Sequence, residues 1–144
     1  MGGVEDWARL AIDAGLDIHR KMGPGLFESV YEALLTLQLT RAGLSVQRQA
    51  PINIEYDGIV LGEGFRADLL VENSLIIEVK SVERLSPLHT KQLLTYLRLL
   101  QQPSGLLINF GGETFREGIK RVVNNHFNAS PHLRVNRAPI IEIE

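Results

Sequence analysis

Three charged residues stand in two stretches of the sequence that are otherwise almost entirely aliphatic. Asp68 lies within Arg66-Ala67-Asp68-Leu69-Leu70-Val71, and Glu78 and Lys80 lie within Ile76-Ile77-Glu78-Val79-Lys80. Burying a charge in a sheet is costly unless the charge is paired or binds a metal ion. The three residues therefore indicate a site. Two carboxylates beside a lysine suit metal-assisted hydrolysis of a phosphodiester.

The loop between the two stretches decides whether the carboxylates meet. A three-residue loop pairs Val71 with Leu75, and hence Asp68 with Glu78, whereas a two-residue loop puts the carboxylates on opposite faces of the sheet. In the first register Lys80 joins both acids on one face, and the intervening apolar residues point to a core. Two carboxylates about 5 Å apart repel each other, and Mg²⁺ relieves that repulsion by taking oxygen ligands from both. The lysine could orient or activate a water, or offset charge that develops on a phosphate.

Helix and strand periodicities indicate which elements hold these residues. Apolar residues three or four apart predict an amphipathic helix over 4–22, and a second helix over 27–42 follows the break at Gly23-Pro24-Gly25. Alternating apolar and polar residues then predict an antiparallel meander. Its strands are expected over 44–56, 59–62, 65–71 and 75–79.

The rest of the chain predicts a crossover onto the same sheet. Ser86-Pro87 is a favourable helix start, and that helix should end near Gln102. The stretch 105–110 then reads as a buried strand, parallel to the 75–79 strand by the crossover rule. A short turn or helix and an edge strand over 119–123 follow. The expected fold class is α/β, a mixed central sheet flanked by helices in the order ααβββαβ. We expect one domain over 1–124 and a C-terminal tail over 125–144 that is either an extra strand or poorly ordered.

The composition limits the chemistry and the partners. The 144 residues contain no cysteine, which excludes disulfides, thiolate zinc sites and thiol catalysis. No apolar run approaches the ~20 residues of a membrane span, and the start of the chain lacks the order of a signal peptide, so we expect a cytoplasmic protein with no membrane partner. The net charge of -2 lacks the strong positive balance of a protein that coats nucleic acid.

Two motifs are specific enough to suggest a family. The first is Asp68, a nine-residue gap and Glu78-Val79-Lys80, and the second is Gly25-Leu26-Phe27-Glu28-Ser29-Val30-Tyr31. The first resembles the D…(D/E)xK signature of the PD-(D/E)XK nuclease superfamily. The second spells G-x-x-E-x-x-Y, the signature of the small bacterial GxxExxY protein family, and the resemblance covers about residues 7–124. Ala67 stands where the longer superfamily pattern has a proline.

The resemblance implies a restriction-endonuclease-like fold and a Mg²⁺-dependent nuclease, with Mn²⁺ as a substitute and with DNA favoured over RNA as substrate. In the superfamily, the residues that match Asp68 and Glu78 bind the metal ion together with the backbone carbonyl at Val79. The lysine that matches Lys80 assists the attacking water. A glutamate on an early helix, here Glu28, completes the acidic cluster and the metal ligands.

Further candidates lie around this group. Gln92, a candidate catalytic residue, and Tyr96 match a Q-x-x-x-Y element that some superfamily nucleases carry, and they share one helical face. His89 lies one turn before Gln92. Arg66 either holds a phosphate or only screens the carboxylates. The candidate substrate-binding residues are Arg66, Tyr31, Tyr96, His89 and His19.

Each candidate also has a purely structural interpretation. The acids and the lysine could form an ion pair at the end of two strands, and Glu28 is favourable in the first turn of any helix. Tyrosines often pack in cores, and histidines are often plain hydrogen-bonding residues. The function hypothesis is a Mg²⁺-dependent nuclease. The alternatives are a catalytically weak or inactive module of the same fold that binds nucleic acid or a protein, and a structural ion-pair cluster that binds no metal. A homodimer is left open.

Overall fold

The N-terminal helices form at the positions that the periodicity predicted. In the computed structural model, which describes residues 2–125 and 140–142, α1 (Val4–Met22) and α2 (Glu28–Arg41) are joined by the Gly-Pro-Gly break. Gly23 ends α1 with a φ of 72°, a backbone conformation that favours glycine. None of the described helices combines the length and the apolar character that a membrane span requires.

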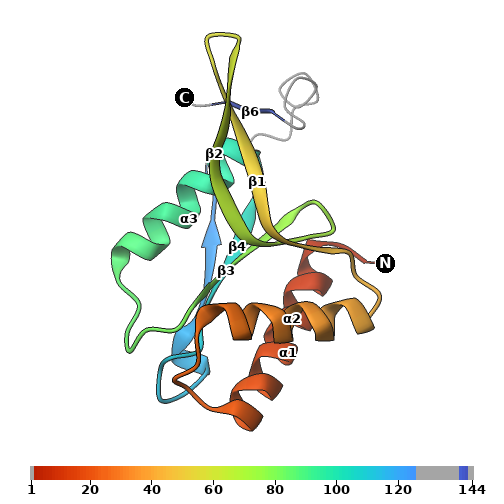
Figure 1. Cartoon of the computed structure of the whole chain (residues 1–144), viewed down its shortest axis with the longest axis vertical. Helices are drawn as coiled ribbons and strands as arrows, with labels where there is room; N and C mark the ends of the chain where they lie inside the picture. Colours follow the sequence, from red (N-terminus) through yellow and green to blue (C-terminus); the bar gives the residue numbers. More distant parts are fainter. Residues whose placement is uncertain (1, 126–139, 143–144) are drawn as a thin grey trace.

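The described strands form a single mixed sheet (Figure 1). The strands and the remaining helices are β1 (Val46–Tyr56), β2 (Ile59–Val71), β3 (Leu75–Lys80), α3 (Pro87–Leu100), β4 (Ser104–Asn109), the 3₁₀ turn η1 (Arg116–Gly118), β5 (Ile119–Val123) and β6 (Ile140–Glu142). The six strands lie in the order β5-β4-β3-β2-β1-β6. After β3 the chain crosses through α3 to β4, which pairs in parallel with β3 as the crossover rule predicted.

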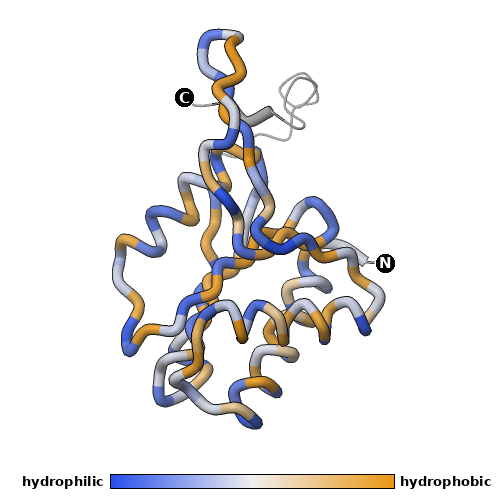
Figure 2. Tube along the Cα trace, viewed as in Figure 1, coloured by the Kyte–Doolittle hydropathy of each residue, from blue (hydrophilic) through white to orange (hydrophobic). Residues whose placement is uncertain are grey.

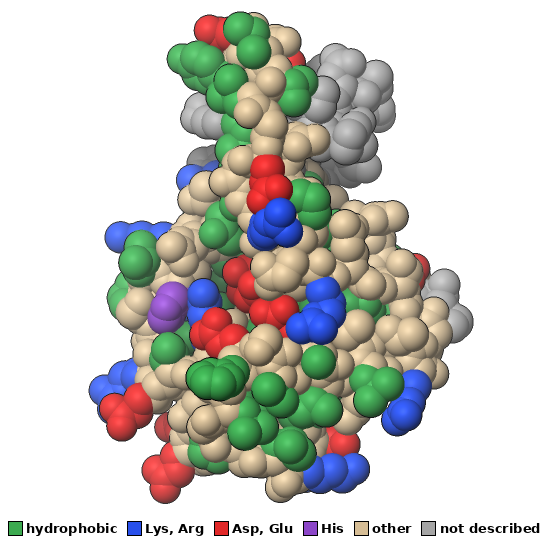
Figure 3. Space-filling view, in the orientation of Figure 1, with side chains coloured by type: hydrophobic (Ala, Val, Ile, Leu, Met, Phe, Trp, Pro, Cys, Tyr) green, Lys and Arg blue, Asp and Glu red, His purple; other side chains and the backbone are tan. Residues whose placement is uncertain are grey.

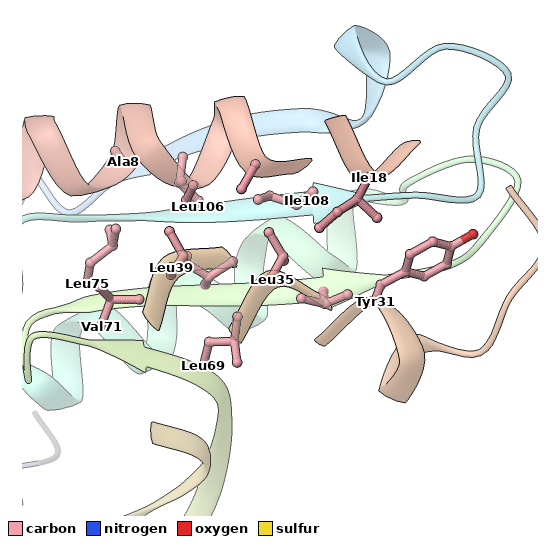
Figure 4. Packing of buried hydrophobic residues seen from close by; sticks show 14 of the residues in the cluster. Ala8, Ile18, Tyr31, Leu35, Leu39, Leu69, Val71, Leu75, Leu106 and Ile108 are labelled. Atoms are coloured by element: carbon pink, nitrogen blue, oxygen red, sulfur yellow. The ribbon is translucent and has the colours of Figure 1, made fainter. Parts of the chain in front are cut away.

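The helices cover the sheet on both faces, so the expected mixed α/β class is confirmed. The helices α1 and α2 pack on one face, where a cluster of buried side chains joins them to β3 and β4 (Figure 4). The helix α3 covers the other face with a second buried cluster. Hydrophobic residues concentrate in the central strands, as Figure 2 shows. Such burial on both faces is typical of strands at the centre of a sheet.

The strand β2 corrects one expectation. The stretches 59–62 and 65–71 were expected to be separate strands, but they form one continuous strand of 13 residues. Two register shifts against β1 take up the extra residues, and Gly62 adopts a φ of 94° there. Glycine thus permits bulges that bend the strand without ending it. The resulting β1–β2 hairpin projects from the body of the molecule (Figure 1).

The tail lies partly outside the described residues. Of the expected segment 125–144, residues 126–139 and 143–144 are among those that the structure does not describe. The short strand β6 falls where an extra strand was one of the two expectations, and it pairs in parallel with β1 at the edge of the sheet.

Candidate active site

The two carboxylates face each other where β2 and β3 part. The last backbone pair between these two strands is Leu69 with Ile77, in the register that the three-residue loop predicted. Beyond that pair, hydrogen bonds from backbone N–H groups to the two carboxylates connect the strands. The Asp68 N–H donates to Glu78 Oε2 at 3.0 Å, and the Val79 N–H donates to Asp68 Oδ2 at 2.8 Å. Each carboxylate is therefore held in place by the backbone of the opposite strand.

Burial and neighbouring negative charge both disfavour the ionised form of these two acids. Glu78 is only 7% exposed. Burial raises the pKa of Glu78 to about 8, and the neighbouring charge of Asp68 adds to the effect. Burial also raises the pKa of Asp68, although the Val79 N–H that it accepts acts in the opposite direction. A buried and a half-buried carboxylate with raised pKa values form a pair that a cation would stabilise.

Lys80 supplies positive charge to this pair. It is the last residue of β3 and is half-buried. Its ammonium group lowers the pKa of both Asp68 and Glu78, although burial outweighs that effect. Val79 stands between the two charged residues of β3, and its side chain is buried in the core under α1 and α2. The strand thus divides its residues between core and site as its alternation predicted.

The helix α2 brings two more carboxylates to the same edge. Glu28, in its first turn, accepts a hydrogen bond from the Ser81 N–H through Oε2 at 3.1 Å. Glu32 is 5% exposed, and both of its carboxylate oxygens accept hydrogen bonds from the Gln49 amide at 3.1 and 3.3 Å. The same amide donates to Asp68 Oδ1 at 3.2 Å. Gln49 therefore links Glu32 of α2 to Asp68 of β2.

Three of these residues were missed by the sequence interpretation. Glu32 follows Glu28 by one helical turn on the same face, and that spacing could have identified it. Burial raises the pKa of Glu32, with Asp68 adding to the effect. Gln49 and Ser81 carry no comparable signal, because only the tertiary fold brings them to the acids. Gln49 has a φ of 49°, an uncommon conformation for a non-glycine residue.

The helix α3 presents one of its candidates to the site. Burial raises the pKa of Tyr96, and the charges of Glu78 and Asp68 add to the effect, which places the hydroxyl near the two acids. Its ring stacks on Phe65 of β2 with ring centroids 3.9 Å apart. Gln92 is exposed on α3. The imidazole of His89 forms a capping hydrogen bond at the start of α3, where its Nδ1 accepts the Ser86 N–H at 3.2 Å.

Other candidates are not brought to the acids. Tyr31 is fully buried (Figure 4). Its ring stacks on Phe110 with centroids 4.3 Å apart. Its hydroxyl donates to the Gly23 carbonyl and accepts the Leu26 N–H, so it anchors the turn before α2. The structure thus favours the packing interpretation of Tyr31 over substrate contact.

His19 and Arg66 also have local partners. His19 Nε2 lies 3.2 Å from the carbonyl oxygen of Gly112, and its ring is near Phe115. Arg66 forms a bidentate pair with Glu63 of its own strand, with Nε 2.6 Å from Oε2. Since Arg66 is paired with Glu63, it is not paired with the site carboxylates.

The acids differ in exposure, because Asp68 and Glu28 are half-buried whereas Glu78 and Glu32 are buried. Figure 3 shows acidic side chains gathered near the centre of one face of the molecule, with Lys or Arg side chains on both sides of them. Arg48 is a cation that pairs with a site acid, because its guanidinium lies 3.7 Å from Glu32. A charged cluster that is both partly buried and reachable is typical of a functional site.

The donor set suits a hard divalent cation, although the ligands are not drawn together. In the described part of the chain, no group of three or more His, Asp or Glu side chains is placed to hold a metal ion. Carboxylate oxygens are nevertheless the ligands that Mg²⁺ prefers. Among the described residues, none donates a hydrogen bond to Oε1 of Glu78, and only the Gln49 amide donates to Oδ1 of Asp68. The pair therefore fits such an ion if these two oxygens turn to it.

Comparison with known proteins agrees with this geometry. A family model described as the PD-(D/E)XK nuclease superfamily matches residues 5–122, a range that includes Glu28, Asp68, Glu78 and Lys80. Neither the curated proteins nor the solved structures give a match. The restriction-endonuclease-like arrangement of a mixed sheet between helices is the one expected for that superfamily. By its sequence match over most of its length, the chain belongs to the PD-(D/E)XK nuclease superfamily.

Proposed function

We propose that this protein is a metal-dependent nuclease that hydrolyses phosphodiester bonds of nucleic acid. The observation that carries the proposal is the pair Asp68 and Glu78, held by each other's strands with Lys80 beside them. A structural ion pair would need one cation for each acid. Here Arg48 pairs with Glu32, and Lys80 is the cation that acts on both Asp68 and Glu78, so the two strand acids share one positive charge and a divalent cation would offset the remainder.

Asp68 and Glu78 would hold Mg²⁺, or Mn²⁺ as a substitute, and Glu28 and the Val79 carbonyl are the further candidate ligands. When bound, the ion would lower the pKa of a water molecule and offset charge on the phosphate. The protein's own residues do the positioning. The N–H groups of Asp68 and Val79 fix one oxygen of each carboxylate, and the Gln49 amide holds the remaining oxygen of Asp68.

Lys80 is proposed to act directly on the reaction. Its ammonium group has three hydrogen-bond donors and lies close enough to both acids to lower their pKa. From there it can orient the attacking water or donate to the phosphate oxygen as negative charge develops. Tyr96, near the same acids, can donate a further hydrogen bond to a phosphate. Gln92 and His89, on the same helix, remain proposed contacts of the bound strand.

The G-x-x-E-x-x-Y motif supports a narrower assignment to the GxxExxY family. In that motif Glu28 reaches the backbone after Lys80, and Tyr31 fixes the turn before α2. The motif would thus serve to place a helix acid beside the strand acids. DNA is the proposed substrate in preference to RNA, and a homodimer would be needed only for cutting both strands of a duplex.

A cleavage panel tests the proposal. Wild type and Lys80→Ala are incubated with labelled single- and double-stranded DNA and RNA, with Mg²⁺, with Mn²⁺ and with a chelator. We expect metal-dependent cleavage by the wild type and its loss in Lys80→Ala. Equal cleavage by both proteins would refute the role of Lys80. Binding of a strand without cleavage by the wild type would instead favour an inactive binding module of the same fold.

A further inference from the structure

The side chain of Phe27 is the most exposed large hydrophobic group in the described part of the chain. It is 83% exposed, although most large apolar side chains there are buried or half-buried. It directly precedes Glu28 in the sequence. An apolar ring left in water beside a charged site points to a binding role rather than a packing one.

Neither helix capping nor packing explains a phenylalanine at this position. Phe27 is the N-cap residue of α2, where Ser, Thr, Asp and Asn are favoured, and its side chain makes no capping hydrogen bond. The neighbouring Leu26 already packs against the core. The sequence thus breaks a local rule at Phe27 without a visible gain in stability, which is expected of functional positions.

The backbone around Phe27 is fixed, and it is fixed to the residue after Lys80. The Ser81 hydroxyl donates to the Leu26 carbonyl at 2.7 Å, and the Ser81 N–H donates to the Glu28 carboxylate at 3.1 Å. Both chain neighbours of Phe27 are therefore bound to Ser81. The aromatic ring is held on a rigid turn beside the end of β3, where Lys80 lies, while the ring itself stays in solvent.

The arginines near the site are already paired with acids, so contacts with phosphate are not enough to explain how a strand would be bound. Arg48 forms an ion pair with Glu32, and Arg66 forms one with Glu63, so neither is a free cation. The whole chain has a net charge of -2. Proteins that hold single strands obtain much of their affinity from aromatic side chains on which bases stack. A base within a duplex has both faces covered by its neighbours and offers no such surface.

We infer that Phe27 stacks on an unpaired base of the strand whose phosphate lies at the acids, so that the preferred substrate is single-stranded or has unpaired bases at the cut. This inference rests on the proposed nuclease function and narrows its substrate class. It assigns Phe27 to substrate binding and gives it no part in the chemical step.

Strand binding measured without turnover tests this inference. Fluorescence anisotropy is recorded with Ca²⁺ in place of Mg²⁺, and electrophoresis checks that the strand stays intact. The ligands are a labelled DNA strand, the same strand with abasic positions, and its duplex. The proteins are wild type, Phe27→Ala, Phe27→Trp and the control Leu61→Ala. Leu61 is also a highly exposed apolar residue, at 64%, and lies on the projecting β1–β2 hairpin far from α2 (Figure 1).

We expect Phe27→Ala to weaken binding of the intact strand by roughly tenfold, the scale of losing one base stack. Binding of the abasic strand and the duplex should not change. Phe27→Trp should retain the affinity, and its added tryptophan emission should be quenched by the strand. Leu61→Ala should behave as wild type. Equal affinity of wild type and Phe27→Ala, an equal loss on the abasic strand, or no strand binding at all would overturn the inference.

Failure of the inference and failure of the proposed function give different results. If the wild type cleaves nucleic acid with Mg²⁺ but Phe27→Ala binds the intact strand normally, the function stands and the stacking role is wrong. If binding depends on Phe27 but no strand is cleaved, the stacking role stands and the hydrolytic function is wrong.

Discussion

Replacing Glu78 by glutamine should make the metal-free protein more stable at neutral pH, although it should abolish hydrolysis. The wild-type carboxyl group is 7% exposed and its pKa is raised to about 8. Glutamine has nearly the same shape and retains an oxygen that can accept the Asp68 N–H. It carries no charge, so the energetic penalty of the buried acid is removed while the hydrogen bond is kept.

The magnitude follows from proton linkage. The Glu78 carboxyl has a pKa of about 8 in the folded chain and an ordinary value of 4.5. Between these two values the folded state binds more protons than the unfolded state, so the free energy of unfolding falls as the pH rises. Each pH unit in that interval costs about 1.4 kcal/mol, which gives a loss of about 3 kcal/mol between roughly pH 5 and pH 7.5. This loss should be largely absent in Glu78→Gln. Asp68 and Glu32, whose pKa values are also raised, act in the same direction. The free energy of unfolding of Glu78→Gln should therefore still fall as the pH rises, but with a smaller slope than in the wild type.

Urea denaturation with a chelator present, repeated at several pH values, measures this effect. We expect wild type to lose stability across the interval and Glu78→Gln to lose much less, so that the variant is the more stable protein at about pH 7.5. The exposed acid Glu63, outside the site, provides the control Glu63→Gln, which should follow the wild type. If Glu78→Gln is less stable than wild type at that pH, or if both show the same slope, the reasoning about the buried acid is wrong.

The remaining predictions concern Lys80, Tyr31 and Gly111. Lys80→Met should reduce cleavage by at least about a hundredfold while metal binding persists, because the lysine acts on water or phosphate rather than on the ion; loss of metal binding, seen by calorimetry, would contradict that role. Tyr31→Phe should lower the free energy of unfolding by about 1 to 3 kcal/mol, since the Gly23 carbonyl and the Leu26 N–H lose their partner, and should leave cleavage measurable. An unchanged urea midpoint would refute the anchoring role. Gly111→Ala should destabilise by about 2 kcal/mol or more in the same assay, because a Cβ there would clash with the Val82 backbone; wild-type stability would show that this contact relaxes freely.

Local pattern was sufficient for most of the fold. The helix α1 and the register of Val71 with Leu75 follow from periodicity and loop length, since both depend on neighbours in sequence. The parallel pairing of β3 with β4 follows from the handedness and length of a helical crossover. The glycines near Gly62 were misleading, because a glycine can end a strand or bulge it, and only the pairing with β1 decides which occurs.

The site was predictable where its residues lie on adjacent strands and less so where they come from elsewhere. Asp68 and Glu78 were brought together by the hairpin alone. Gln49 and Ser81 reach the acids through contacts between distant parts of the chain, which single-sequence reasoning does not supply. Tyr31 was a candidate because it shares a motif with Glu28. One helix presents both, yet Tyr31 points into the core against Phe110, a contact that no motif records.

The central claim is that Asp68 and Glu78 together bind a divalent cation. The most direct measurement is the melting temperature at about pH 7.5 with and without Mg²⁺, for wild type, Asp68→Asn and the control Glu63→Gln. At a free Mg²⁺ concentration about 100 times the Kd, the wild type and the control should gain about 2.7 kcal/mol, a rise in Tm of roughly 5 to 10 °C. Asp68→Asn should show no such rise. No rise in the wild type, or an equal rise in all three proteins, would contradict the claim.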